Sequence, residues 1–316
     1  MKLHEDKDTF LDLVEGTSQA MGLPQVHVEK DYWVTNALRN LSRSDLASYA
    51  VFKGGTSLSK AYKLIQRFSE DIDLAVMAGD IGSNKCKKLL KDVESATNIG
   101  LKQVEDERTS KGSKYRKAVY QYPREIESEY FGQASPELLI EVNAFTRPEP
   151  FEPLEIQSLI AEVLVEQSLD DIVGQYALQP FKINVLSIKR TLVEKLLGVV
   201  KDSYKDDPVA ALAKRIRHLY DLHFILGLEE YQDFLCSDAF SVMCETCIQD
   251  EKDGFFGYSD CLEKPLIEAP LFSGFSEWST KFQQIYEGDF ADLVYGELPP
   301  LADIADTLNF IKNSLP

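Results

Sequence analysis

The sequence predicts an α/β fold in which a mixed sheet with flanking helices is followed by a helical second half. Runs rich in β-branched and aromatic residues are typical of strands, and they lie at 49–52, 71–76, 115–122 and 138–145. Segments with apolar residues at helical spacing alternate with these runs, at 4–20, 28–41 and 83–97. From Ser187 onwards helical spacing dominates. We therefore expect a sheet-containing domain over 1–180 and a helical domain over 181–316.

The composition is that of a folded chain with a large core. Of the 316 residues, 44% are hydrophobic and 10% are aromatic. No apolar run approaches the roughly 20 residues that a membrane-spanning helix needs, so no membrane association is expected. The N-terminal MKLHEDKDTF is charged and lacks the apolar centre of a secretory signal. Five cysteines, an odd number, suggest a reducing cytoplasm.

The net charge of −18 argues against broad, nonspecific affinity for nucleic acid, which depends on lysine and arginine neutralising phosphates. One local basic cluster remains, on a predicted hairpin loop and strand. Its members are Arg108, Lys111, Lys114, Arg116 and Lys117. The cluster is either a local binding groove or a balance for the acidic surface, and the sequence leaves both open.

The most informative stretch runs from Val51 to Val76. Its first part, KGGTS at 53–57, is predicted to be a turn, because glycine adopts backbone angles that other residues reach only with strain. Apolar residues at helical spacing follow as far as Ile65, so the turn should open a helix. Anions bind well at a helix start, where backbone N–H groups are free. The candidates for such a phosphate cradle are Gly54, Gly55, Thr56 and Ser57.

The second part of the stretch predicts a metal site. In a strand over 71–76, Asp71 and Asp73 point the same way, about 7 Å apart at the usual rise per residue. Two such carboxylates repel each other unless a positive charge lies between them. Mg²⁺, or Mn²⁺ in its place, suits oxygen ligands and is usually bound through one or two carboxylates plus substrate phosphates. The alternative is a surface turn with two solvated aspartates.

A third carboxylate lies in the strand predicted over 138–145. Glu141 shares a face with Leu139 and Asn143, inside a strongly apolar run. A carboxylate there needs a partner, because burying it unpaired is costly. The partner is a metal ion, or else Glu141 is on an edge strand and reaches solvent.

The remaining elements follow in order. The proline-rich segment 147–153 reads as the start of a linker, and 154–186 should complete the sheet. Ser187 or Thr191 can cap the next helix, in which Lys195 has apolar neighbours. A single helix is predicted over 208–226, where Arg217 and Asp221 are four residues apart and can pair. The C-x-x-C of Cys244 and Cys247, flanked by Cys236 and Cys261, is either a zinc site or part of an ordinary helix.

Several of these segments carry a family resemblance. KGGTSL with RFSEDIDL, at 53–58 and 67–74, resembles the first motif of the DNA polymerase β-like nucleotidyltransferases and is most similar to the AbiEii toxin family, which includes the MenT toxins. VEKDYWVTNAL, SIKRTLVEKLLGVV and KRIRHLYDLHFIL resemble further motifs of that family. The resemblance implies that Glu141 takes the place of the third metal-binding carboxylate, that Lys195 binds nucleotide phosphates, and that Asp221 is essential to the active site. Ser69 matches a motif hydroxyl, which either bonds the triphosphate or caps the loop.

The resemblance also implies a function. We expect a nucleotidyltransferase domain over 1–180, with the active site between it and the helical domain. The expected reaction is Mg²⁺-dependent transfer of a nucleoside monophosphate from an NTP to an RNA acceptor such as the tRNA 3′ end. The chain would be the toxin of an AbiE-type (type IV) toxin–antitoxin pair, with a winged-helix antitoxin as a possible partner. The alternatives are transfer to a protein or small-molecule hydroxyl, and a non-catalytic nucleotide-binding module.

Overall fold

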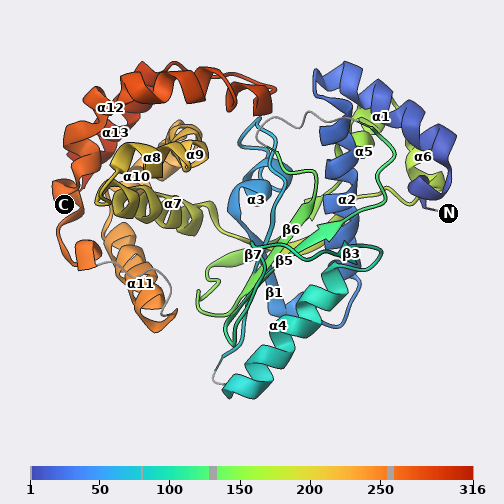
Figure 1. Ribbon diagram of the computed structural model, residues 1–316, viewed down its shortest axis with the longest axis horizontal. Helices are drawn as coiled ribbons and strands as arrows, with labels where there is room; N and C mark the ends of the chain where they lie inside the picture. Colours follow the sequence, from blue (N-terminus) through green and yellow to red (C-terminus); the bar gives the residue numbers. More distant parts are fainter. Residues whose placement is uncertain (1, 80, 128–133, 255–259, 316) are drawn as a thin grey trace. The chain divides into compact units, whose positions relative to one another are not determined.

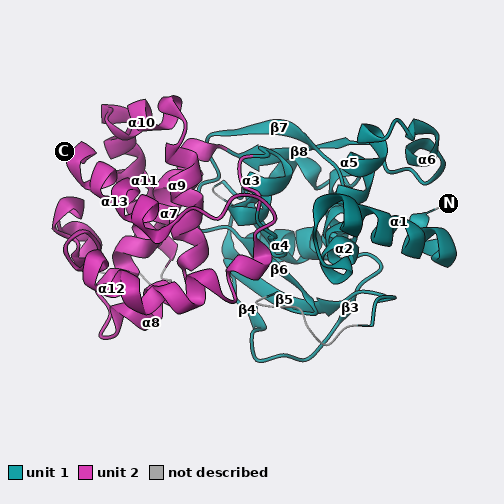
Figure 2. Ribbon diagram, turned by 90° about the horizontal axis from the view of Figure 1, so that it is seen from above, with its two compact units in different colours: residues 1–63, 67–186 teal, residues 64–66, 187–316 magenta. Residues whose placement is uncertain are grey.

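The computed structural model describes residues 2–79, 81–127, 134–254 and 260–315 (Figure 1). The chain forms two compact units (Figure 2). The first comprises residues 1–63 and 67–186, and the second comprises residues 64–66 and 187–316. The last strand of the sheet, β8 (Phe181–Leu186), belongs to the first unit.

A mixed sheet of eight strands, counted over the described residues, forms the centre of the first unit. The strands are β1 (Ala50–Lys53), β2 (Ile72–Val76), β3 (Lys102–Gln103), β4 (Ser110–Lys111), β5 (Tyr115–Gln121), β6 (Leu138–Asn143), β7 (Phe151–Ile156) and β8. Their order is β3-β5-β6-β2-β1-β8-β7, and β4 pairs with β5 outside this path. β2 is parallel to β6 and β1 is parallel to β8, whereas the other pairs are antiparallel. β2 and β6 are therefore interior strands, side by side.

The helices of the first unit cover this sheet. They are α1 (Lys7–Met21), α2 (Gln25–Ser42), α3 (Gly54–Lys60), α4 (Ser83–Thr97), α5 (Leu159–Glu166) and α6 (Asp170–Gln175), with short 3₁₀ turns η1 (Leu3–Glu5) and η2 (Ala47–Tyr49). α2 packs against α1, α4, α5 and β8, and α4 packs against β5 and β6. α3 follows β1 directly and packs against β1 and β2.

The sheet core follows from the alternation of side chains along β2 and β6. Ile72 and Leu74 pair in register with Ile140 and Val142, and all four side chains are fully buried. Alternate residues of a strand point to opposite faces, so the residues between them occupy the other face. Those residues are Asp73 and Glu141. The apolar half of the pattern therefore holds the two carboxylates in place on the opposite side of the sheet.

The second unit is built from helices. They are α7 (Ile188–Ser203), α8 (Pro208–Ala213), α9 (Ile216–Leu226), α10 (Glu229–Leu235), α11 (Asp238–Gly254), α12 (Pro270–Glu287) and α13 (Leu301–Ser314), with 3₁₀ turns η3 (Asp260–Glu263), η4 (Leu266–Glu268) and η5 (Ala291–Leu293). α7 packs against α8, α9, α11 and α12. The expectation of an α/β sheet unit followed by a helical part is confirmed.

Three predicted elements differ from the structure. The helix after the glycine pair ends at Lys60 instead of continuing to Ile65, and Lys63 adopts a positive φ of 53°. The proline-rich segment that was expected to be a linker contains β7, an edge strand, where Pro153 can be accommodated because an edge residue need not donate a ladder hydrogen bond. The helix expected over 208–226 is divided into α8 and α9, which meet at Lys214 and Arg215.

The N-terminus of α7 resolves a choice that the sequence left open. The Ser187 side chain accepts a hydrogen bond from the Arg190 backbone N–H and caps the helix. Thr191 lies inside the helix, so its assignment as a cap is wrong.

Throughout the described residues, no helix has both the length and the apolar character needed to cross a bilayer.

Candidate active site

Four charged residues form one row across the first unit's sheet. Lys53 of β1 pairs in register with Asp73 of β2, and Asp73 pairs with Glu141 of β6. Glu141 in turn pairs with Lys117 of β5. Side chains that are directly opposite in a sheet lie on the same face, within reach of each other. The row therefore places two adjacent carboxylates between two ammonium groups.

The face that carries this row is fixed by the neighbour of Lys117. Arg116 precedes Lys117 in β5 and therefore points to the opposite face. Its guanidinium bonds the Glu94 carboxylate of α4, and the Tyr120 hydroxyl donates to the same carboxylate at 2.8 Å. Arg116 thus marks the face that α4 covers. Asp73 and Glu141 lie on the other face, where both are only partly buried.

The basic cluster at 108–117 does not form one binding surface. Arg116 is 7% exposed and paired with Glu94, so it is not available to a ligand. Arg108 bonds Asp106 and Glu137, and its hydrogen bonds lower the pKa of Asp106 to about 2. For Arg108 and Arg116, charge balance is the correct interpretation, and the groove interpretation is wrong.

Gly54 and Gly55 bring the backbone against side chains of the predicted site. Gly54 has a φ of +80°, which favours glycine, and a Cβ there would overlap the Asp73 carboxylate. A Cβ at Gly55 would overlap the buried Arg67 guanidinium and lie 3.1 Å from Ser69 Oγ. Both glycines are therefore required by close approach, and the Asp73 carboxylate lies directly against the start of α3.

The hydroxyls of the predicted phosphate cradle hold the loop together. Thr56 Oγ1 donates to the Asp71 carbonyl at 2.7 Å and meets Ser69 Oγ at 2.9 Å. Ser57 Oγ donates to the Gly54 carbonyl at 2.8 Å. Both side chains are buried; Thr56 joins α3 to the loop before β2, and Ser57 holds the first turn of α3. For Ser69 the loop contact is observed, and a contact with a triphosphate stays a prediction.

Glu141 has two neighbours on β5. The Tyr115 hydroxyl donates to Glu141 Oε2 at 3.0 Å, and Lys117 Nζ is 3.8 Å from the same oxygen. Burial, and then the Glu141 charge, raise the pKa of Tyr115, so the hydroxyl keeps its proton and remains a donor. Because β6 lies between β5 and β2, Glu141 is not on an edge strand, and that alternative is wrong.

The carboxylates suit a hard divalent cation in their chemistry. Across the residues that the structure describes, no group of three or more His, Cys, Asp or Glu side chains is arranged to hold an ion. Mg²⁺ usually binds one or two carboxylates and completes its shell with water and substrate phosphates. Asp73 with its register partner Glu141 satisfies that smaller requirement. Asp71 directly precedes β2, so its place on the same face stays a prediction.

Helix α2 supports the site through three consecutive buried charges. Glu29 accepts the backbone N–H groups of 125 and 126 at 2.6 and 3.2 Å. Lys30 Nζ donates to Glu70 Oε2, next to Asp71. Asp31 accepts from Lys60 Nζ at the end of α3 and from the backbone N–H of 159. Lys30 and Asp31 belong to the VEKDYWVTNAL segment that resembles a family motif. In the structure, they join α2 to the segments that carry the site.

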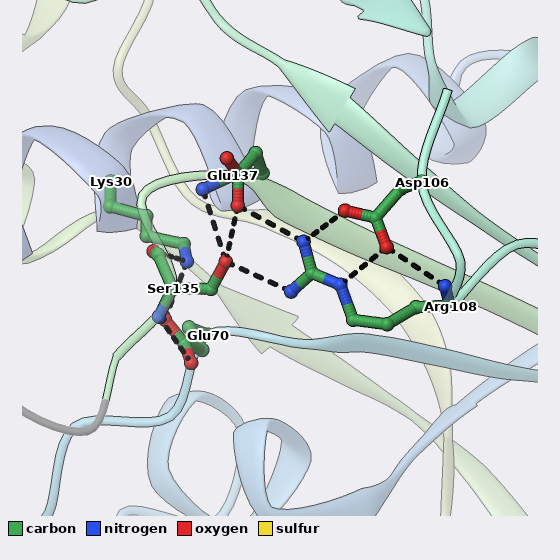
Figure 3. A network of polar contacts seen from close by, with 6 residues as sticks. All are labelled: Lys30, Glu70, Asp106, Arg108, Ser135 and Glu137. Carbon is green, nitrogen blue, oxygen red and sulfur yellow. Dashed lines mark hydrogen bonds and ion pairs between the residues drawn. The ribbon is translucent and has the colours of Figure 1, made fainter. Parts of the chain in front are cut away.

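The contact between Lys30 and Glu70 is part of a larger polar network that includes Ser135, Glu137 and Arg108 (Figure 3). Lys30 Nζ also donates to the Ser135 carbonyl, and the Ser135 N–H donates to the Glu70 carboxylate at 2.9 and 3.1 Å. Ser135 Oγ donates to Glu137 Oε2 at 2.6 Å and accepts from Arg108 at 3.2 Å. The network joins the loop before β2 to the start of β6. It therefore constrains the two strands that carry Asp73 and Glu141.

In the second unit, two further predicted site residues meet. Lys195 Nζ of α7 lies 2.7 Å from Asp221 Oδ2 of α9, and the two side chains are 6% and 0% exposed. Lys195 is thus buried, as its apolar neighbours in the sequence led us to expect. Glu194, the residue before Lys195, is ion-paired with Arg190 at 3.2 Å. Lys195 and Asp221 belong to the second unit and the three carboxylates to the first, so a shared site stays a prediction.

Cys244 and Cys247 of the C-x-x-C motif lie on the buried side of a helix. Cys244 and Cys247 are buried free thiols on α11. Burial raises the pKa of Cys244 to about 12, so its thiol stays protonated and is a poor metal ligand. Within the described part of the chain, these cysteines do not gather with other potential ligands into a group of three, which favours the helix interpretation over the zinc site.

The sequence missed several residues that the site contains. Lys53 carried a signal, because it ends a strand and directly precedes the glycine pair. Lys117 was noted only as a member of the basic cluster and Tyr115 only as part of a predicted strand, because their position beside Glu141 depends on which strands pair. The Lys30–Glu70 contact joins residues that are far apart in the sequence, so no local pattern reveals it.

A mixed sheet with adjacent carboxylates beside a Gly-Gly turn defines the class of nucleotidyltransferases, and comparisons agree. The sequence profile described as "Nucleotidyl transferase AbiEii toxin, Type IV TA system" matches residues 36–305. Among solved structures, MenT4, a nucleotidyltransferase toxin from Mycobacterium tuberculosis H37Rv, matches with a TM-score of 0.53 and 16% identity, over 90% of this chain and 82% of that chain. JHP933 from Helicobacter pylori matches with a TM-score of 0.38 and 18% identity, over 84% and 94% of the two chains. A comparison with curated proteins finds no match.

The chain belongs to the AbiEii family of nucleotidyltransferase toxins of type IV toxin–antitoxin systems. The low identity to MenT4 limits that likeness to the fold. Family membership implies an NTP substrate and an antitoxin partner. It favours an enzyme over a non-catalytic nucleotide-binding module.

Proposed function

We propose that the protein transfers a nucleoside monophosphate from an NTP to an RNA acceptor such as the tRNA 3′ end, releases pyrophosphate, and depends on Mg²⁺ or Mn²⁺. The observation that carries this proposal is the register pairing of Asp73 with Glu141 beside the Gly54 turn. In-line phosphoryl transfer needs positioning and charge stabilisation more than covalent catalysis. Two carboxylates flanked by two lysines meet that need.

Each residue has a proposed role. Asp71, Asp73 and Glu141 would hold the divalent cation, which when bound neutralises the triphosphate and lowers the pKa of the acceptor hydroxyl. The backbone of Gly54 to Ser57, with Ser69, would bind the phosphates. Lys53 and Lys117 lie in the same row as the carboxylates and would attract the anionic substrate.

Lys195 and Asp221 are proposed as a second part of the machinery, contributed by the helical unit. Lys195 would bind nucleotide phosphates. Asp221 is fully buried and holds Lys195 Nζ at 2.7 Å, which supports a role in fixing the orientation of that ammonium group. A charge held in one orientation binds a substrate at a lower entropy cost than a free side chain.

The acceptor is the open part of the proposal. The family's MenT relatives favour RNA, and the five free thiols suit the reducing cytoplasm, where NTPs and tRNA occur. The net charge of −18 and the pairing of Arg108 and Arg116 with carboxylates favour the second candidate, a protein or small-molecule hydroxyl. The antitoxin would be a winged-helix protein.

The test is transfer of label from α-³²P NTPs in the presence of Mg²⁺, with total RNA, purified tRNA and total protein as acceptors. Wild type and Asp45→Asn, which changes an exposed aspartate, should label tRNA equally. Asp73→Asn and Glu141→Gln should lose the activity by about a hundredfold or more, because each removes one charge from the paired carboxylates. Equal labelling by Asp73→Asn and wild type would refute the site assignment. Label in protein instead of RNA would select the second candidate.

A further inference from the structure

A pocket that the proposed reaction does not use lies along the C-terminal half of α2. It has a volume of about 50 Å³ and is bounded by α2, the N-terminal segment, and the residues around Ser158 and 176–178. Three of its lining residues are cations, namely Lys2, Arg39 and Arg43. Asn36 and Asn40 add amide groups that can donate hydrogen bonds.

The charged residues that line this pocket are all positive. None of its described lining residues is a carboxylate, although the chain as a whole carries a net charge of −18. The acidic groups next to it are already engaged. Glu5 Oε2 accepts the Lys2 backbone N–H at 2.9 Å, and Asp6 Oδ2 accepts the Tyr176 hydroxyl at 2.6 Å. The pocket therefore concentrates positive charge on an acidic protein.

Arg39 is the central cation. Its side chain is only 8% exposed, donates to the Gln179 carbonyl at 2.8 Å, and lies 4.5 Å from the centre of the Phe181 ring. Both partners are neutral. Burial, and then the charge of Arg43, lower the pKa of Arg39 to about 10. A buried guanidinium beside a second guanidinium is destabilising unless an anion compensates it.

The helix dipole explains only part of this arrangement. Cations near a helix C-terminus are favoured, and Arg43 is the C-cap residue of α2. Arg39 lies in the last turn and is also favoured by the dipole, but the dipole does not account for Lys2, which comes from another segment. A ligand that bridges the three cations accounts for all of them.

We propose that the pocket formed by Lys2, Arg39 and Arg43 binds a phosphate group. The arginine fork matches the oxygens of phosphate, and several cations around one anion give strong, charge-assisted hydrogen bonds. The phosphate comes either from free inorganic phosphate or from the backbone of a nucleic acid. None of the residues that line this pocket belongs to the row formed by Lys53, Asp73, Glu141 and Lys117, so this site is distinct from the carboxylate row.

The test is calorimetric titration with inorganic phosphate, and separately with a short single-stranded RNA, at constant ionic strength. The pocket variant is Lys2→Gln/Arg43→Gln, which changes two exposed residues and spares the buried Arg39. The matched control is Lys87→Gln/Lys91→Gln, which removes the same charge from the exposed side of α4. Binding should be at least roughly tenfold weaker in the pocket variant than in wild type and the control.

The two titrations distinguish the sources. Loss of phosphate binding with unchanged RNA binding identifies free phosphate, and loss of RNA binding identifies a nucleic-acid phosphate. If both ligands bind the pocket variant as tightly as the control, or if neither ligand binds wild type, the proposal is wrong. Nucleotidyl transfer is not the readout, so failure here leaves the proposed function untouched.

Discussion

Replacing Lys30 by methionine tests whether the buried ion pair behind the site holds the fold together. Lys30 is 0% exposed, and its partner Glu70 is 4% exposed. Burial lowers the pKa of Lys30, and the Glu70 charge opposes that shift, so the two groups depend on each other. Lys30→Met removes the ammonium group that faces the buried Glu70 carboxylate, while the hydrogen bonds from the Ser135 N–H to that carboxylate stay in place. Breaking a buried pair in this way costs about 3–5 kcal/mol.

The assay is urea or thermal unfolding, compared with two further variants. A loss of 3–5 kcal/mol corresponds to a fall in the melting temperature of roughly 6–20 °C for a unit of this size. Lys30→Met/Glu70→Leu should recover part of the loss, because no charge is then left unpaired. Lys7→Met removes a lysine that is 63% exposed from its pair with Glu125 and should cost less than about 1 kcal/mol.

Two results would refute this reasoning. If Lys30→Met is no less stable than Lys7→Met, the buried pair does not contribute as the geometry requires. If the double variant is less stable than Lys30→Met by the full effect of a second deletion, the two residues do not act as a pair.

Two further predictions concern the glycine turn and the thiols. Gly54→Ala should fold but lose most of its transfer activity. Gly54 has a φ of +80°, so a Cβ there displaces the Asp73 carboxylate and adds about 1–2 kcal/mol of backbone strain. Normal activity in a folded variant would contradict this prediction. In native protein, a thiol reagent near pH 8 should modify the exposed Cys236 rapidly and Cys244 and Cys247 only on unfolding. Rapid labelling of Cys244 or Cys247 in native protein, measured by mass spectrometry, would contradict the buried assignment. Burial raises the pKa of Cys244 to about 12. The contribution of this protonated thiol to stability is therefore fully present below the unfolded pKa of about 8.5 and is lost as pH rises towards the folded value.

Local patterns in the sequence predicted much of the fold. The alternation in 71–76 and 138–145 correctly separated Asp73 and Glu141 from the apolar residues beside them, because side-chain alternation is a property of the single strand. It did not reveal that these strands are parallel neighbours, because register depends on the whole sheet. The proposed carboxylate pair was therefore anticipated residue by residue, but its flanking lysines were not.

The errors share a physical cause. Apolar spacing continues to Ile65, yet the helix stops at Lys60 and Lys63 adopts a positive φ; beyond it, the Gln66 carbonyl accepts the backbone N–H groups of 295 and 296. Proline was taken to break regular structure at Pro153, but an edge strand tolerates it. The three consecutive charges of α2, Glu29 to Asp31, give no local sign of burial in the sequence, and only tertiary contacts bury them. In each case, contacts between distant segments override a local preference.

The pairing of β2 with β6 has a consequence for how such a chain is made. Ribosomes release the N-terminal segments first, and Asp73 emerges well before Glu141. A nascent polypeptide that stops before Leu138 lacks the neighbour that completes the acidic pair, and β1 also awaits its parallel partner β8. Loop closure over these separations is slow compared with helix formation. A truncated or half-made chain of this kind therefore lacks the paired carboxylates on which the proposed transfer reaction depends.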